Sequence, residues 1–328
     1  MRETVVGIVG GSGYIGSALA DYLSGKFVVK VIDKNPPRNH KHKIKYQQCD
    51  IVQYNQVKQA LNDVELVIHT AIVQIPQINE RKKLGYEVNF LGTQNICKVV
   101  DETPSMKGMI LAGTWHVFGE KGLDGIIDEA FGYQPDKVEE RARLYALSKI
   151  NQEVVMRYYD EMSEKVYGDI RMGTVLGEGM PEKTAANIFI SRGLRGESLT
   201  PFKHSMHRTM LYVDVKDVCR AFEIYATKII GGEIRKEENG LAHVVNLCWP
   251  KPVTILELAQ LVRDTIAKST EGKIRPRIEI VDEGKPICYK PSAKQKLKVD
   301  ISKVRRFLGI TKLANPKKTI DRIIRASL

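Results

Sequence analysis

The sequence predicts an α/β protein with a Rossmann-like, doubly wound parallel sheet and a smaller C-terminal domain. In the first 177 residues, apolar runs typical of buried strands alternate with segments of helical periodicity. This alternation favours a parallel sheet covered by helices. The first apolar run, VVGIVG, leads directly into a glycine-rich turn and an amphipathic segment, as at the start of a doubly wound domain. Beyond residue 177 the alternation loosens. We therefore expect residues 1–177, with 209–248, to form one domain and residues 178–328 mainly a second.

Apolar patterning and turn residues predict the elements in order. Strands are expected within 5–10, 26–33, 43–51, 65–71, 106–114, 168–177, 243–248 and 277–282. Helices are expected within 16–24, 55–63, 87–102, 138–162, 185–195, 212–229, 254–269, 302–309 and 317–327.

The composition is that of an ordinary globular protein. The 328 residues are 43% hydrophobic and 27% charged, and no apolar run reaches the ~20 residues of a membrane span. The N-terminus lacks the basic leader and apolar stretch of a secretory signal, which predicts a cytoplasmic protein without a membrane partner. The five cysteines show no CxxC or Cys/His spacing. We expect buried, reduced thiols and no metal site.

The net charge of +12 is concentrated toward the C-terminus. Residues 285–328 contain 13 Lys and Arg against two Asp. Such a surface attracts anionic ligands, and it is also typical of a solvated surface suited to a hot or salty habitat. Aromatic side chains do not alternate regularly with the basic ones, as they would on a surface that stacks the bases of single-stranded nucleic acid. Nucleic acid is therefore not an expected partner.

The glycine turn predicts a dinucleotide site. Gly10, Gly13 and Gly16 follow the first strand and open the first helix, where a pyrophosphate can approach backbone N–H groups. We expect the cofactor-binding residues here to be these glycines with Tyr14 and Ile15. The second strand ends in Asp33, at the place where an acidic side chain binds a ribose diol. This carboxylate would repel a 2′-phosphate and so favours NAD, although Lys34 and Arg38 lie nearby.

Tyr145 and Lys149 form the strongest catalytic signal. The spacing i, i+4 places both on one face of a helix. An ammonium about 4 Å from the phenol is worth roughly 4 kcal/mol at an effective dielectric of ~20, or ~3 pKa units. This predicts that Lys149 lowers the pKa of Tyr145 toward neutrality, where the phenolate can act as a base.

With these motifs, the chain resembles an extended short-chain dehydrogenase/reductase of the NAD-dependent sugar-nucleotide epimerase and dehydratase group, over essentially its whole length. The resemblance implies cofactor contacts from Asp50 and Ile51, from Thr70 and Ala71, and from Asn89, besides Tyr145 and Lys149. The segment AGTWHVFG (112–119) resembles the family's Ser-Ser-x-x-x-Val-Tyr-Gly. This similarity places Thr114 at the catalytic Ser/Thr, where its hydroxyl can hold the substrate hydroxyl.

Departures from the family pattern affect the expected reaction and substrate. The 4,6-dehydratases carry Asp-Glu after the catalytic Thr, but this chain has Trp115 and His116, which disfavours a dehydratase. Substrate contacts implied by the resemblance are Thr114, Asn187, Phe202 and Arg208, of which Arg208 would grip a phosphate.

The expected protein is an NAD-dependent epimerase that acts on a nucleotide-diphosphate sugar through a transient ketone, in a cytoplasmic homodimer. One alternative is an NAD(P)-dependent dehydrogenase or reductase of a nonsugar alcohol or ketone. Another, of a different class, is a noncatalytic NAD-binding regulator, which would not need Thr114, Tyr145 and Lys149 together.

Overall fold

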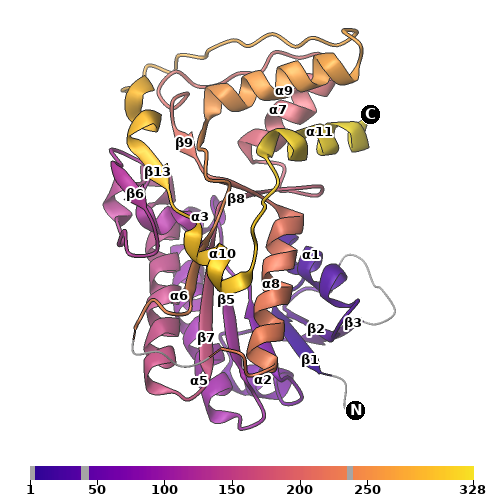
Figure 1. The fold of residues 1–328 in the computed structure, drawn as a ribbon, viewed down its shortest axis with the longest axis vertical. Coiled ribbons are helices and arrows are strands. Elements are labelled where there is room, and N and C mark those ends of the chain that lie inside the picture. The colour runs from indigo at the N-terminus through magenta and orange to yellow at the C-terminus, as the bar shows by residue number, and fades with distance from the viewer. Residues whose placement is uncertain (1–3, 38–43, 235–238) are drawn as a thin grey trace. The chain divides into compact units, whose positions relative to one another are not determined.

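The computed structural model describes residues 4–37, 44–234 and 239–328 (Figure 1). The chain splits into two compact units. Unit 1 comprises Met1–Val117, Gly132–Arg171 and Cys219–Val245, and unit 2 comprises Phe118–Phe131, Met172–Val218 and Asn246–Leu328. These bounds differ from the expected division at residue 177. Residues 118–131 belong to unit 2 because β6 (Gly125–Ile127) pairs in parallel with β13 (Leu297–Val299).

Unit 1 is built on a seven-stranded sheet in the order β11-β7-β5-β4-β1-β2-β3. Its strands are β1 (Val5–Val9), β2 (Val28–Asp33), β3 (Ile44–Gln48), β4 (Leu66–His69), β5 (Gly108–Thr114), β7 (Val166–Met172) and β11 (Val244–Leu247), the last of which ends in unit 2. The pairs from β5 across to β3 are parallel. The chain order reverses direction between β1 and β4, as in doubly wound sheets. The predicted Rossmann-like fold class is confirmed.

Helices flank this sheet. They are α1 (Tyr14–Leu23), α2 (Tyr54–Ala60), α3 (Gln77–Glu80), α4 (Lys82–Tyr86), the π-helix η1 (Glu87–Gly92), α5 (Thr93–Glu102), the short 3-10 turns η2 (Trp115–Phe118), η3 (Pro135–Lys137) and η4 (Glu140–Ala142), α6 (Arg143–Met162) and α8 (Val215–Ile230). Helices α5 and α6 lie next to each other (Figure 1). No helix in the described part of the chain is long and apolar enough to cross a membrane.

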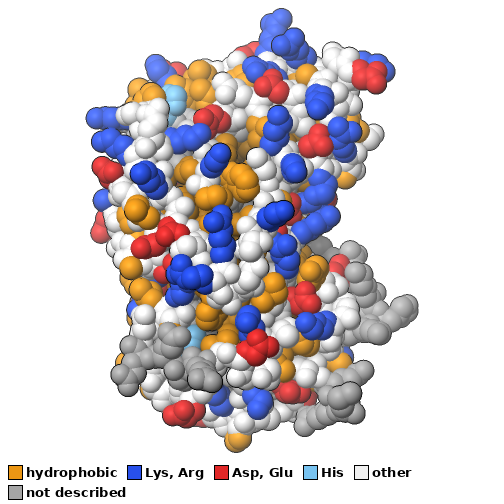
Figure 2. Space-filling view, in the orientation of Figure 1, with side chains coloured by type: hydrophobic (Ala, Val, Ile, Leu, Met, Phe, Trp, Pro, Cys, Tyr) orange, Lys and Arg blue, Asp and Glu red, His pale blue; other side chains and the backbone are white. Residues whose placement is uncertain are grey.

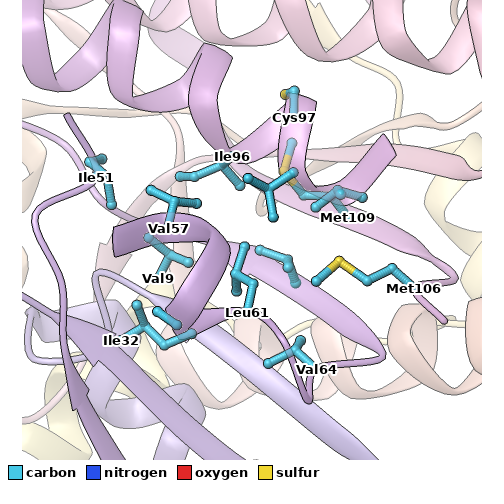
Figure 3. Packing of buried hydrophobic residues seen from close by; sticks show 14 of the residues in the cluster. Val9, Ile32, Ile51, Val57, Leu61, Val64, Ile96, Cys97, Met106 and Met109 are labelled. Carbon is cyan, nitrogen blue, oxygen red and sulfur yellow. The ribbon is translucent and has the colours of Figure 1, made fainter. Parts of the chain in front are cut away.

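An apolar core fills the space between one face of the sheet and the helices that cover it. Figure 3 shows Val9 of β1 and Ile32 of β2 packing with Val57 of α2 and Ile96 of α5, all at most 1% exposed. Burying a side chain of this size contributes about 1.5–3 kcal/mol. This packing fixes the carboxyl ends of the strands, where the candidate site lies.

Unit 2 contains short paired strands and four helices with bounds close to those expected. Its elements are β6, β8 (Thr174–Leu176), α7 (Ala185–Leu194), β9 (Thr209–Met210), β10 (Tyr212–Asp214), β12 (Val253–Thr254), α9 (Ile255–Ser269), η5 (Pro291–Lys296), β13, α10 (Ser302–Leu308) and α11 (Pro316–Ser327). Figure 2 shows Lys and Arg side chains spread over the face where α9 and α11 lie, with Asp and Glu between them. On this face the basic charge is dispersed.

Three element predictions are wrong in detail. The helix expected over 212–229 begins only at Val215, because Tyr212–Asp214 forms β10 and pairs with β8. The helix expected from residue 138 begins at Arg143. The strand expected over 277–282 forms only two isolated bridges, to Leu199 and Phe202. Between these two residues lies Pro201, which has no N–H to continue a ladder.

Cysteine burial also differs from the expectation at one position. All five thiols are free, but Cys288 is exposed while the other four are buried.

Candidate active site

The glycine turn after β1 has no room for side chains. Gly10 has φ +83°, and a Cβ there would lie 2.4 Å from the backbone N of Ala71. A Cβ on Gly16 would lie 2.3 Å from the carbonyl oxygen of Gly10. Gly13 is the N-cap of α1 and supplies no side-chain cap. The helix therefore begins, at Tyr14 and Ile15, with the backbone geometry that suits an anion.

Asp33 is held against this turn. One carboxylate oxygen accepts a hydrogen bond from the backbone N–H of Ser12 (3.1 Å), and the other accepts one from Asn35 (2.9 Å). The neighbouring Lys34 is engaged elsewhere, since its Nζ lies 3.0 Å from a carboxylate oxygen of Asp50. Arg38 lies outside the described residues. The acidic group is thus fixed at the end of β2 next to the glycine turn.

The ends of β1 and β4 meet beside the turn. The Thr70 hydroxyl donates to the carbonyls of Val9 (2.9 Å) and Gly10 (3.0 Å). Ala71 packs directly against Gly10. Ile51 is 7% exposed, and a Cβ on Gly92 would clash with its side chain. The Ile51 side chain is therefore part of the apolar core (Figure 3).

Asn89 holds two segments together. Its Oδ1 accepts from the backbone N–H of Val73 (2.7 Å), and its Nδ2 donates to the Val73 carbonyl and to the Ser148 hydroxyl, both at 3.1 Å. The side chain is fully buried in η1. Because these amide atoms bind protein groups, we expect Asn89 to position the segment after Ala71, and α6, for the cofactor.

Thr114, Tyr145 and Lys149 come together within unit 1. Thr114 ends β5, and its hydroxyl is hydrogen-bonded to Tyr145. Lys149 lies one turn further along α6, and its Nζ donates to the carbonyl of Ala112 on β5 (2.7 Å). The structure therefore brings together at one strand end the two residues that the spacing singled out and the one that the family resemblance singled out.

The predicted effect of Lys149 on Tyr145 is wrong for this structure. Burial raises the pKa of Tyr145 to about 12, and the hydrogen bond from Thr114 opposes this rise. Lys149 does not lower it, because its ammonium is itself buried and directed at a carbonyl. Burial lowers the pKa of Lys149 to about 8, against the attraction of Asp169.

A buried ionic cluster lies next to these three residues, and the sequence analysis did not single it out. Glu153 of α6 binds Arg171 of β7 through two hydrogen bonds, Nε to Oε2 (2.9 Å) and Nη2 to Oε1 (2.5 Å). Asp169, also on β7, occupies the space that a side chain at Gly113 would need, since a Cβ there would lie 2.1 Å from its Oδ1. The sequence does contain a signal for this cluster. Asp169 and Arg171 are two charged residues within an apolar strand segment, where burial requires that they have partners.

The charged form of Asp169 is disfavoured in this cluster. Burial, followed by the adjacent Glu153, raises the pKa of Asp169 well above its ordinary range. As a carboxylate, Asp169 has both oxygens buried without a donor. In its protonated form it can donate a hydrogen bond to Glu153, whose pKa stays below its ordinary value because Arg171 stabilises the charge.

Replacing Asp169 by Asn is expected to change how stability depends on pH. In the unfolded chain Asp169 loses its proton near pH ~4, whereas the folded protein keeps the proton to higher pH. Above pH ~4 the folded state then binds more protons than the unfolded state. The contribution of Asp169 to the free energy of unfolding is therefore complete below pH ~4 and falls by up to about 1.4 kcal/mol per pH unit above it. Asp169→Asn should gain stability over the wild type as pH rises. Urea denaturation of both proteins at several pH values measures this, and a pH-independent difference would contradict it.

His69 is a structural histidine. Its Nε2 lies 2.9 Å from the Thr93 hydroxyl, and the ring is fully buried. Burial, and to a lesser extent Lys149, lowers the pKa of His69 to about 3. The neutral ring therefore packs between β4, α5 and α6.

The predicted substrate residues other than Thr114 lie in unit 2. Asn187, in the first turn of α7, donates from Nδ2 to the Met180 carbonyl (2.9 Å) and accepts from Ser191 (2.9 Å). Phe202 is 42% exposed and stacks on His204, with 5.7 Å between ring centroids. Burial raises the pKa of Tyr212, and the positive charge of Arg208 opposes this rise.

The sequence comparison shows the family. Residues 6–236 match the family described as "NAD dependent epimerase/dehydratase family". The chain belongs to this family. The recognised resemblance is thus confirmed, and the family description agrees with the expected NAD. Among the described residues, no group of three or more His, Cys, Asp or Glu could hold a metal ion.

UDP-glucuronic acid decarboxylase 1 of Danio rerio is 24% identical over 281 residues, which cover 83% of this chain and 63% of that relative. The chain therefore spans less than two thirds of the relative's length. Two solved structures share the fold. One is MoeE5 in complex with UDP-glucuronic acid and NAD, with a TM-score of 0.79 and 20% identity over 98% of this chain and 99% of that one. The other is UDP-glucose 4-epimerase of Thermus thermophilus with NAD, with a TM-score of 0.78 and 19% identity over 99% and 100%.

Proposed function

We propose that this protein is an NAD-dependent epimerase that acts on a nucleotide-diphosphate sugar through a transient ketone. The observation that carries the proposal is the assembly of Thr114, Tyr145 and Lys149 at the end of β5. A noncatalytic NAD-binding regulator would not need this assembly. Trp115 and His116 stand where the dehydratases carry Asp and Glu, which favours epimerisation over loss of water. A family relationship to NAD-dependent epimerases and dehydratases supports the same reaction class.

The residues of unit 1 fit NAD. The turn that Gly10 and Gly16 keep free of side chains admits a pyrophosphate, and the fixed Asp33 carboxylate suits a ribose diol. When bound, NAD would supply the acceptor of a hydride and return it later. Thr114 would hold the sugar hydroxyl, and Tyr145 would take its proton as a phenolate, a form that the positive charge of bound NAD would favour. Lys149, whose Nζ donates to the Ala112 carbonyl, would contact the cofactor.

The position of Asp33 predicts a preference for NAD over NADP. A 2′-phosphate would meet this carboxylate, and Lys34 is already paired with Asp50. We expect NAD to bind at least about tenfold more tightly, or ~1.4 kcal/mol. Calorimetric titration with both cofactors measures the ratio. Equal affinities would show that the Asp33 carboxylate does not select the cofactor.

For the substrate, we propose that unit 2 supplies nucleotide-diphosphate contacts from Asn187, Phe202 and Arg208. Phe202 offers an exposed ring for a base. Arg208 offers charge-assisted hydrogen bonds to a phosphate.

A panel of sugar nucleotides tests the function. The protein is incubated with each compound without added cofactor, and the products are separated and weighed by mass spectrometry. A new isomer of unchanged mass supports the epimerase. Loss of water would indicate a dehydratase, and loss of CO₂ from a nucleotide-diphosphate glucuronic acid would indicate a decarboxylase. Turnover only of an uncharged alcohol, with net formation of reduced cofactor, would favour the dehydrogenase alternative.

We also propose that the protein is a homodimer joined through α6. Leu147, Val154 and Tyr158 are 42%, 46% and 70% exposed, and their spacing i, i+7, i+11 places them on one helix face. Leu91, on the neighbouring η1, is 42% exposed. An apolar stripe of this kind is typical of a helix that packs on a second copy.

Replacing Val154 by Asp should convert the dimer to a monomer, because the charge would be buried without a partner. Light scattering after gel filtration measures the mass, and Lys83→Gln, on the exposed part of α4, serves as the control. A wild-type protein that is already monomeric, or a variant that stays dimeric, would contradict the α6 interface.

A further inference from the structure

His116 folds back onto the Thr114 hydroxyl and the ring of Tyr145. Its Nδ1 lies 3.1 Å from Oγ1 of Thr114, and its backbone N–H donates to the same oxygen at 3.3 Å. Its ring stands edge-on to the ring of Tyr145, with 5.5 Å between centroids and a 90° interplanar angle. Two residues after the strand end, the imidazole is therefore the side chain that contacts both Thr114 and Tyr145.

The hydrogen bonds of the Thr114 hydroxyl can be counted. A hydroxyl has one proton to donate and two lone pairs to accept with. To stabilise a phenolate at Tyr145, or to hold a substrate oxygen, Thr114 must donate its one proton there. The backbone N–H of His116 occupies one lone pair. The imidazole then decides where the proton of Thr114 goes.

Two imidazole tautomers give opposite results. With a proton on Nδ1, His116 donates to the second lone pair, and the Thr114 proton is directed to Tyr145. With a bare Nδ1, Thr114 would donate to His116 instead and lose its proton for the reaction. Only the first tautomer leaves the Thr114 proton available for a phenolate at Tyr145 or for a substrate oxygen.

We propose that His116 is a positioning residue whose Nδ1–H donates to Thr114 and thereby directs the Thr114 hydroxyl proton toward Tyr145 and the substrate oxygen. This inference rests on the proposed function, since it assigns His116 a role in the same proton transfer. It gives a purpose to a side chain that stands where dehydratases carry an acid.

The tautomer can be measured without substrate. Two-bond ¹H–¹⁵N correlation spectra of the ¹⁵N-labelled protein, recorded at mildly alkaline pH where the ring is neutral, show which nitrogen carries the proton. The His116 signals are assigned by their loss in His116→Asn. We expect the proton on Nδ1. A neutral ring with the proton on Nε2 would overturn the proposal.

Kinetics of two variants test the same hydrogen bond. His116→Asn keeps an N–H donor near the position of Nδ1, whereas His116→Leu keeps bulk and removes the donor. We expect kcat for a sugar nucleotide to fall about tenfold or more in His116→Leu, the rate equivalent of one hydrogen bond. KM should change little, and His116→Asn should restore most of the loss. Equal losses in both variants, or none in His116→Leu, would contradict the role.

A double-mutant cycle links the effect to Thr114. In the Thr114→Ala background there is no hydroxyl to direct, so His116→Leu should cause no further loss. An additive further loss would show that His116 acts otherwise. If the wild type turns over no sugar nucleotide, the proposed function fails, while the tautomer measurement still decides the Thr114–His116 hydrogen bond.

Discussion

Replacing Tyr145 by Phe is expected to lower turnover of the sugar nucleotide by roughly 10²-fold or more, while NAD still binds. The variant keeps the ring that packs edge-on against His116 but loses the oxygen that, as a phenolate, takes the proton, and general-base catalysis contributes about 10²–10⁴-fold. Steady-state kinetics and calorimetric titration with NAD separate the two effects. Lys149→Met should impair both turnover and NAD binding, because in the proposed function Lys149 contacts the cofactor that accepts the hydride.

A second tyrosine of the same helix provides the control. Tyr158 is 70% exposed in one copy, and Phe would keep its apolar contacts in the proposed α6 interface, so Tyr158→Phe should leave turnover close to that of the wild type. Near-normal turnover by Tyr145→Phe would remove Tyr145 from the chemistry, and the epimerase mechanism would fail with it.

The fold could be predicted because its determinants are local. Apolar runs of strand length alternating with helical periodicity give the sheet of unit 1, and the glycine turn defines its first crossover. The errors occur where tertiary pairing overrides local pattern. Tyr212–Asp214 continues the apolar spacing of α8 but pairs with β8 instead, and the loop 118–131 joins unit 2 through a strand more than 150 residues away.

The residues of the candidate site could be predicted from the sequence, but the direction of their pKa shifts could not. The i, i+4 spacing placed Tyr145 and Lys149 on one helix face, and the resemblance of segment 112–119 to the family motif pointed to Thr114. The direction of the Tyr145 pKa shift depends on burial and on where the Lys149 ammonium points. Neither can be derived from spacing. The contact of Asp169 with Gly113 joins two strands, so no local pattern reveals it.

The buried pair of Glu153 and Arg171 should give the largest single effect on stability. Their side chains are each 1% exposed, and Tyr133 also donates to Glu153 (2.8 Å). Glu153→Leu would leave the guanidinium buried without its carboxylate partner, and breaking a buried pair in this way costs about 3–5 kcal/mol. Urea denaturation measures the loss. The control is Lys83→Gln, which removes one partner of the exposed pair with Glu87 and should cost less than about 1 kcal/mol.

Asp169 makes this loss depend on a second residue. Burial raises the pKa of Asp169 most and remains in Glu153→Leu, but the repulsion from Glu153 disappears, while the attraction to Arg171 and Lys149 remains. The pKa of Asp169 should therefore fall, and its carboxylate should replace part of the lost negative charge. Glu153→Leu should therefore cost more in the Asp169→Asn background, where no carboxylate is left, than in the wild type. Additive losses in the double variant would show that Asp169 does not respond to Glu153. If Glu153→Leu costs less in the Asp169→Asn background than in the wild type, the two carboxyl groups do not share the charge of Arg171.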